Sequence, residues 1–115
     1  MPPAPQRLQL RRTKGWRMPA NTVKVDRATR FGNPFLQSQY GRDRAMALFR
    51  AWIMGSGCPV SMPQDARIGL SRRRREIMRA LPSLRGKNLA CWCPRPEAGE
   101  ADQCHAAVLL KLANR

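Results

Sequence analysis

The sequence is short of acidic residues, aromatic residues and histidine. It has 7 Asp and Glu against 22 Lys and Arg, 6% aromatic residues and 1 His in 115 residues. It has no long apolar run, which excludes a membrane-spanning helix, and no apolar segment before a small-residue cleavage site, which excludes a typical secretory signal. We therefore expect a cytoplasmic protein that has no membrane partner.

Length and composition predict one small domain. A chain of 115 residues with 43% hydrophobic residues is large enough for one modest core. Residues 1–6 are rich in proline and have no apolar periodicity, so we expect a disordered leader there, followed by a single domain over residues 7–115. The sequence does not predict an oligomeric state.

The segment LRGKNLACWCPRPEAGEADQCHAAVLLKL, from Leu84 to Leu112, holds three of the four cysteines and the only histidine. Residues 88–93 are short, apolar and bounded by glycine and proline, which predicts a strand. After a loop, apolar residues at helical spacing predict a helix near residues 104–113. Any chemistry of this protein is expected in this segment.

Four side chains of the segment form a possible metal site. Because side chains alternate along a strand, Cys91 and Cys93 share one face and Trp92 takes the other. A third cysteine and the histidine follow in the first turn of the helix. Three thiols and an imidazole hold a structural zinc in many proteins, although zinc modules usually begin with two or more residues between the first two cysteines. The predicted ligands are Cys91, Cys93, Cys104 and His105.

Two other interpretations fit the same residues. The thiols can be small buried hydrophobic groups, with His105 a hydrogen-bonded residue at a helix start. Alternatively, Cys93 or Cys104 can be a thiolate nucleophile for which His105 acts as the base. Cys58 lies in a separate glycine- and proline-rich loop, and we leave it out of the metal set.

The formal net charge of +15 predicts a polyanionic partner. Such an excess creates a field that attracts nucleic acid or nucleotide phosphates, and arginine suits bidentate phosphate contacts. Coding bias can explain arginine in place of lysine, but it does not explain the scarcity of acids. The candidate phosphate- or nucleotide-binding residues are Arg17, Arg27, Arg30, Asn33, Arg72, Arg73, Arg74 and Arg75.

Three of these candidates surround a predicted turn, Phe-Gly-Asn-Pro-Phe at residues 31–35. We expect Gly32 to take a left-handed backbone there. Arg27, Arg30 and the Asn33 amide can then hold a phosphate or a nucleobase. The alternative is a tight corner whose two phenylalanines pack into the core.

The other candidates have solvated alternatives as well. Arg17 follows Trp16, which can stack on a base or cover the edge of the core. The run Arg72–Arg75 covers one turn of a predicted helix that Ser71 can cap. Four arginines in one turn form a solvated cationic ring that either contacts phosphates or is simply a helix start.

The element order predicts a small α/β domain with a short, mostly parallel sheet. Two strands joined through helices prefer a parallel crossover, which places the carboxyl ends of both strands at one edge, where open α/β sheets bind ligands. Residues 7–12 form either an edge strand or a solvated basic arm. The predicted strands lie near residues 22–27 and 88–93, and the predicted helices, about three in number, near residues 43–54, 72–81 and 104–113.

Two blocks of the sequence carry a family resemblance. The strings LRGKNLACWCPRP and CHAAVLLKLAN, together with KGWRMPANTVKVDRATRFGNPF, resemble the bacterial and phage family called domain of unknown function 4326. In that family's pattern the Cys-His pair is followed by a small residue and then an acid, whereas Ala107 takes the acid's place here. If the acid acts in catalysis in relatives, the resemblance implies that this chain lacks it. No established activity comes with the resemblance.

Two classes of function follow from these motifs. The first is a basic module that binds nucleic acid or nucleotide phosphates and is held together by a structural zinc. The second is an enzyme acting on a nucleotide or a nucleic-acid base. In it Arg27 and Arg30 hold phosphate and Asn33 reads the base, while Cys93 or Cys104 works with His105. The motifs offer no second general acid. Asp26, on the charged face of its predicted strand, can serve as one, but an isolated acid on a strand is usually solvated. We favour the binding module.

Overall fold

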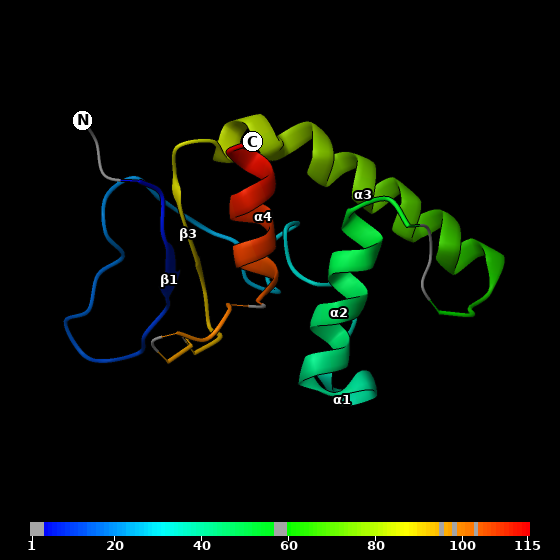
Figure 1. Ribbon diagram of the computed structural model, residues 1–115, viewed down its shortest axis with the longest axis horizontal. Helices are drawn as coiled ribbons and strands as arrows, with labels where there is room; N and C mark the ends of the chain where they lie inside the picture. Colours follow the sequence, from blue (N-terminus) through cyan, green and yellow to red (C-terminus); the bar gives the residue numbers. More distant parts are fainter. Residues whose placement is uncertain (1–3, 57–59, 95, 98, 103) are drawn as a thin grey trace.

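A computed structural model describes residues 4–56, 60–94, 96–97, 99–102 and 104–115, and it shows the predicted α/β domain. Its sheet has three parallel strands in the order β1-β3-β2 (Figure 1). The strands are β1 (Arg7–Gln9), β2 (Thr22–Lys24) and β3 (Asn88–Cys91). The predicted parallel pairing of the second and third strands is confirmed, with Val23 opposite Leu89.

The two predicted strands, near residues 22–27 and 88–93, extended too far along the chain. The second strand ends at Lys24 because the Asp26 carbonyl accepts hydrogen bonds from Thr29 and starts a turn. The third strand ends at Cys91, shortly before Pro94, which has no N–H to donate to a ladder. Of the two alternatives for residues 7–12, the edge strand is confirmed, as β1 over Arg7–Gln9.

The predicted leader, residues 1–6, falls partly outside the described residues, namely at residues 1–3. Gln6 accepts a hydrogen bond from the Leu89 amide on its carbonyl, and its own amide donates to Asn88. The ordered pairing of the chain with β3 therefore begins at Gln6.

Among the described residues four helices accompany the sheet. The short helix at residues 37–40 was not predicted, and the third helix differs clearly from its prediction. The third helix begins at Gln64 after Pro63, eight residues before the predicted start, so Ser71 lies inside it and does not cap it. Proline directly before a helix and Asp65 in its first turn favour the earlier start. None of the described helices is long and apolar enough to cross a membrane. The helices are α1 (Gln37–Tyr40), α2 (Arg42–Ile53), α3 (Gln64–Leu84) and α4 (His105–Ala113).

The last helix is the centre of the packing. α4 contacts β3 and β1 on one side and α2 and α3 on the other (Figure 1). The fully buried core includes Phe49 and Ile53 from α2, Ile77 from α3, Leu89 from β3 and Leu109 from α4. This packing fixes the start of α4 next to the carboxyl end of β3, where the cysteines lie.

Gly32 is required by a close approach of two backbone segments, and the expected left-handed backbone at this position is wrong. Its φ lies outside the left-handed region. A Cβ atom at Gly32 would lie 2.5 Å from the Cα of Arg27 and 2.8 Å from the carbonyl oxygen of Asp26. The turn therefore closes tightly onto the chain that leaves β2.

Candidate functional site

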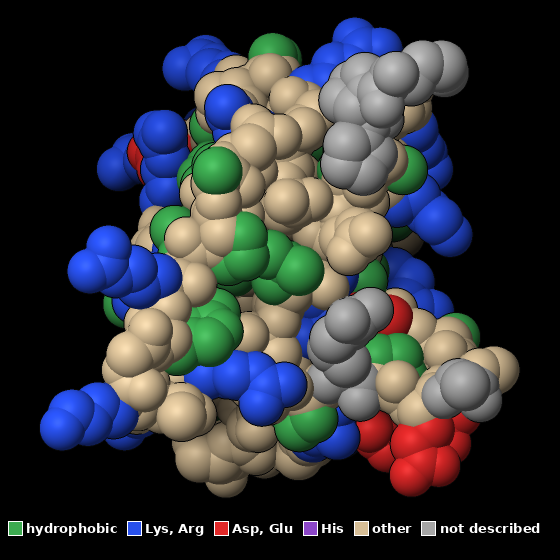
Figure 2. All heavy atoms as spheres, turned by 90° about the vertical axis from the view of Figure 1, so that its left-hand side faces the viewer, with side chains coloured by type: hydrophobic (Ala, Val, Ile, Leu, Met, Phe, Trp, Pro, Cys, Tyr) green, Lys and Arg blue, Asp and Glu red, His purple; other side chains and the backbone are tan. Residues whose placement is uncertain are grey.

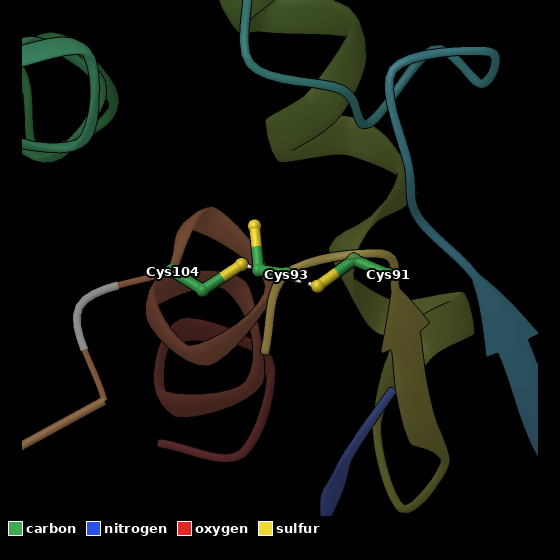
Figure 3. Close-up of side chains that lie close together, drawn as sticks. All are labelled: Cys91, Cys93 and Cys104. Atoms are coloured by element: carbon green, nitrogen blue, oxygen red, sulfur yellow. Dashed lines mark hydrogen bonds between the residues drawn. The ribbon is translucent and has the colours of Figure 1, made fainter. Parts of the chain in front are cut away.

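Three sulfur atoms meet where β3 ends and α4 begins. The Sγ atoms of Cys91, Cys93 and Cys104 all lie within 4.8 Å of one another, and those of Cys91 and Cys104 are 3.1 Å apart. In Figure 3 the side chains of Cys91 and Cys104 extend toward Cys93 from opposite sides. Cys91 and Cys104 are buried and Cys93 is half-buried. Tetrahedral zinc bound at about 2.3 Å needs sulfur atoms about 3.8 Å apart, so the three thiols could hold a metal ion such as zinc.

His105, the fourth predicted ligand, lies next to Cys104 but outside the group whose ligand atoms all lie within 4.8 Å of one another. Its Nε2 lies 2.6 Å from the Val25 carbonyl oxygen, which can only accept, so Nε2 carries the hydrogen. Nδ1 is then unprotonated, and it lies 3.7 Å from the Cys104 Sγ. Burial lowers the pKa of His105, which keeps the ring neutral.

The three thiols differ in acidity because they share hydrogen bonds. Bonds from Cys104 and Cys91 lower the pKa of Cys93, and the nearby positive charge of Arg7 acts in the same direction. Bonds with Cys91 and Cys93, together with burial, raise the pKa of Cys104. These directions favour the thiolate form of Cys93 over that of the more deeply buried Cys104.

Arg7 closes the cysteine loop, a role that the sequence did not predict. Its side chain is buried, with Nε 2.6 Å from Asp102 Oδ2 and the terminal nitrogens 2.5 Å from the Cys93 carbonyl oxygen and 2.8 Å from that of Pro94. One terminal nitrogen also lies 3.8 Å from the Cys91 Sγ. A single guanidinium thus joins β1, the loop and the segment before α4.

A cleft of about 450 Å³ opens at the carboxyl ends of β2 and β3. The structure brings Arg27 and Asn33 together with Cys93 and His105 in its wall, as the parallel sheet predicted. Arg42, at the start of α2, also lines the cleft and was missed, because an arginine at a helix start carries no sequence signal for a site.

The remaining candidates of the turn and the N-terminal loop have other surroundings. The Asn33 amide donates to the Ala45 carbonyl, and its oxygen accepts the Phe35 amide, so this side chain mainly fixes the corner. Arg30 is exposed and lies over the ring of Phe31, outside the cleft. Arg17 is exposed in the loop between β1 and β2. Cys58 lies outside the described residues.

The expected ring of four solvated arginines is wrong for two of its members. Arg73 donates to the Gly32 carbonyl oxygen over 2.8 Å, and Arg74 donates from Nε to the Ile53 carbonyl oxygen over 3.0 Å. Both side chains are half-buried, whereas Arg72 and Arg75 are exposed. The inward pair fixes α3 to α2 and to the turn at Gly32.

Asp26 is buried rather than solvated, which corrects the expectation for this acid. It is 6% exposed, lines the cleft, and accepts the indole N–H of Trp92 on Oδ2 over 2.9 Å. Its Oδ1 is buried without a hydrogen-bond partner among the described residues. The partner lies 66 residues away, so no local pattern could have shown this pair.

Comparisons with known proteins place the chain in a family without assigning an activity. No curated protein and no solved structure matches it. The resemblance seen in the two sequence blocks is confirmed by a family model that matches nearly the whole chain. Through this match, over residues 8–115, the chain belongs to the family described as Domain of unknown function (DUF4326).

Proposed function

We propose that this protein is a nucleotide-binding domain in which a structural zinc holds one wall of the ligand cleft. The observation that carries the proposal is the position of the cleft. It lies at the carboxyl ends of two parallel strands, between the guanidinium groups of Arg27 and Arg42 and the three-cysteine group. Open α/β sheets bind ligands at such edges.

The zinc ligands in this proposal are Cys91, Cys93, Cys104 and the Nδ1 atom of His105. Three close thiols supply the soft ligands that zinc prefers. A histidine that binds zinc usually donates its other ring N–H to a carbonyl or carboxylate, and the bond from Nε2 to Val25 has this form. The Nδ1 atom of His105, 3.7 Å from the Cys104 Sγ, would supply the fourth ligand of a structural site.

The cleft suits a nucleoside phosphate in size and charge. Its volume of about 450 Å³ lies within the range of small-molecule sites. Arg27 and Arg42 are exposed cations at its wall, and Trp92 offers an aromatic surface next to them. The one acid described in the wall, Asp26, is already bonded to that indole. We propose that the phosphate of the nucleotide lies near the arginines and that its base lies near the indole.

Elemental analysis tests the zinc. The purified full-length protein should contain about one zinc per chain, and Cys93→Ser should lose most of it because one thiolate is removed. Cys58→Ser is the matched control, since the sequence places this thiol outside the ligand set, and it should keep its zinc. A parent protein that takes up no zinc when refolded with zinc sulfate contradicts this part of the proposal.

Calorimetric titration with AMP, GMP, CMP and UMP tests the cleft. At least one should bind, and Arg27→Ala should weaken it about tenfold or more, because a charged phosphate contact is lost. Arg30→Ala removes the same charge three residues away, outside the cleft, and should bind like the parent. Because Arg27 donates to the Asn33 carbonyl oxygen over 2.6 Å, Arg42→Ala repeats the test at a cleft arginine outside the turn. Equal losses in the Arg27 and Arg30 variants contradict a site in the cleft.

An enzyme acting on a nucleotide is the second candidate, and the position of Cys93 favours it. This half-buried thiol lines the cleft, and the lowering of its pKa favours the nucleophilic thiolate. Turnover of a nucleotide by the parent that Cys93→Ser abolishes at unchanged zinc content would establish this function. Loss of zinc in the same variant supports the structural role.

A further inference from the structure

The third helix has a composition that its packing does not explain. α3 contains six arginines and no lysine among 21 residues, against two acids, Asp65 and Glu76. Two of the arginines, Arg73 and Arg74, bind backbone carbonyls of other segments. The other four are exposed: Arg67, Arg72, Arg75 and Arg79.

These four exposed arginines share one face of the helix. At about 100° per residue they fall within an arc of roughly 140°, and at 1.5 Å per residue the row from Arg67 to Arg79 is about 18 Å long. We call these four residues the arginine face. The side chains of Gln64 and Ser71 line a hollow between Arg67 and Arg75 on this face and add polar groups to it.

The orientation of the arginine face is fixed by the opposite side of α3. Ile77, Leu81 and Leu84 are buried, and the inward arginines hold the helix to α2 and to the Gly32 turn. Figure 1 shows α3 running along one edge of the molecule, with its first turns projecting beyond α2. The residues of those turns, from Gln64 to Gly69, are all exposed. The helix therefore presents the face outward, and its packing supports the part of the helix from Arg73 to Leu84.

We propose that the arginine face binds the sugar-phosphate backbone of a nucleic acid, a function beyond the nucleotide cleft. Guanidinium groups bind phosphate oxygens in bidentate fashion, and a rigid row of four can contact several successive phosphates. Such contacts carry no sequence information, so binding is independent of sequence. An anionic membrane is the less fitting partner. The large exposed apolar side chains described on α3 are Ile68 and Met78. Two such side chains offer little apolar surface for insertion among lipids.

A matched control variant distinguishes the effect of the arginine face on binding from the effect of the protein's overall charge. Figure 2 shows Lys and Arg side chains at separate points on the β1 side of the molecule, so cations are not confined to α3. The test variant replaces Arg67, Arg72, Arg75 and Arg79 by glutamine, which is also a good helix former. The control replaces four exposed cations of other segments, Arg11, Lys14, Arg44 and Lys111, by glutamine and changes the net charge equally.

The measurement is fluorescence anisotropy of a labelled 20-base-pair duplex and a 20-nucleotide single strand, titrated with full-length protein between 50 and 300 mM salt. Each phosphate contact contributes about −0.9 to the slope of log affinity against log salt on duplex DNA. The arginine-face variant should reduce the slope by about 2 to 4 and weaken binding more than about tenfold at low salt. The control should keep the slope within about 1 of the parent.

Two further measurements test the proposal if the quadruple variant is poorly folded. Glu76→Gln removes one acid at the edge of the face, next to Arg72 and Arg79 on the helix, and should strengthen binding and leave the melting temperature nearly unchanged. Equal losses in the test and control variants, or no effect of Glu76→Gln, overturn the proposal. Binding of the parent to phosphatidylserine vesicles but to neither nucleic acid assigns the face to a membrane and also overturns it. A parent that binds nucleic acid but none of the four nucleotides leaves this proposal standing and rejects the cleft.

Discussion

The Trp92 indole donates its Nε1 hydrogen to Asp26 Oδ2 over 2.9 Å, and this bond joins the segments that follow β2 and β3. Asp26 is 6% exposed, and Lys24 Nζ lies 3.6 Å from the same oxygen. The guanidinium of Arg12 lies 4.8 Å from the centroid of the Trp92 ring. One wall of the cleft is thus fixed by a charge-assisted bond between residues far apart in sequence.

Trp92→Phe should destabilise the protein by about 1 to 3 kcal/mol, because it leaves the buried Asp26 carboxylate without its donor. Urea denaturation measures the free energy of unfolding. The double variant Asp26→Asn/Trp92→Phe should recover part of the loss, since a neutral amide is less costly than a carboxylate to bury without a partner. Additive effects of the two single substitutions would show that the pair is not coupled in solution.

Arg7→Lys should lower the free energy of unfolding by about 2 to 4 kcal/mol even though it keeps the charge. Lysine is a compact donor that cannot reach Asp102 and the carbonyl oxygens of Cys93 and Pro94 at the same time. Zinc affinity should fall as well, because the loop between the cysteines is released. Arg11→Lys, at an exposed position four residues on, should change stability by less than about 0.5 kcal/mol. Similar stability of both lysine variants would contradict the role of Arg7.

The sequence could predict the parts of the site that depend on local rules. The prediction that the thiols of Cys91 and Cys93 lie together is confirmed, although β3 ends at Cys91 and strand alternation does not extend to Cys93. The parallel crossover placed Arg27 and Asn33 at the same edge as Cys93. These rules need only a strand and its direction, which short apolar segments bounded by glycine and proline reveal.

The parts that depend on distant partners could not be predicted. Arg7 reads as one more solvated cation until Asp102, 95 residues away, is seen beside it. The extent of α3 was missed for a different reason. Gly69 and Ser71 disfavour a helix locally, whereas Pro63 before the helix and Asp65 in its first turn favour the observed start.

Gly32→Ala should destabilise the protein by about 1 to 3 kcal/mol, since the new Cβ would overlap the backbone of Arg27 and Asp26. Gly69→Ala is the matched control. Its Cβ meets nothing within 4 Å of the described structure, and alanine at this helical position should stabilise by about 0.5 to 1 kcal/mol. Thermal unfolding of the two variants should therefore shift in opposite directions. A stable Gly32→Ala protein would contradict the close approach.

His105→Ala separates the two roles of this histidine when the substitution is measured with and without zinc. In excess chelator, His105→Ala should lower the free energy of unfolding by about 1 to 3 kcal/mol, because the Val25 carbonyl loses its donor and the contact with Phe49 is lost. In saturating zinc the loss should be larger by the zinc-binding free energy that the histidine contributes, since a metal that binds the folded state stabilises it. Urea denaturation in both conditions gives the two values. Equal losses would show that His105 is not a ligand and that the three thiolates hold the metal with a fourth position open.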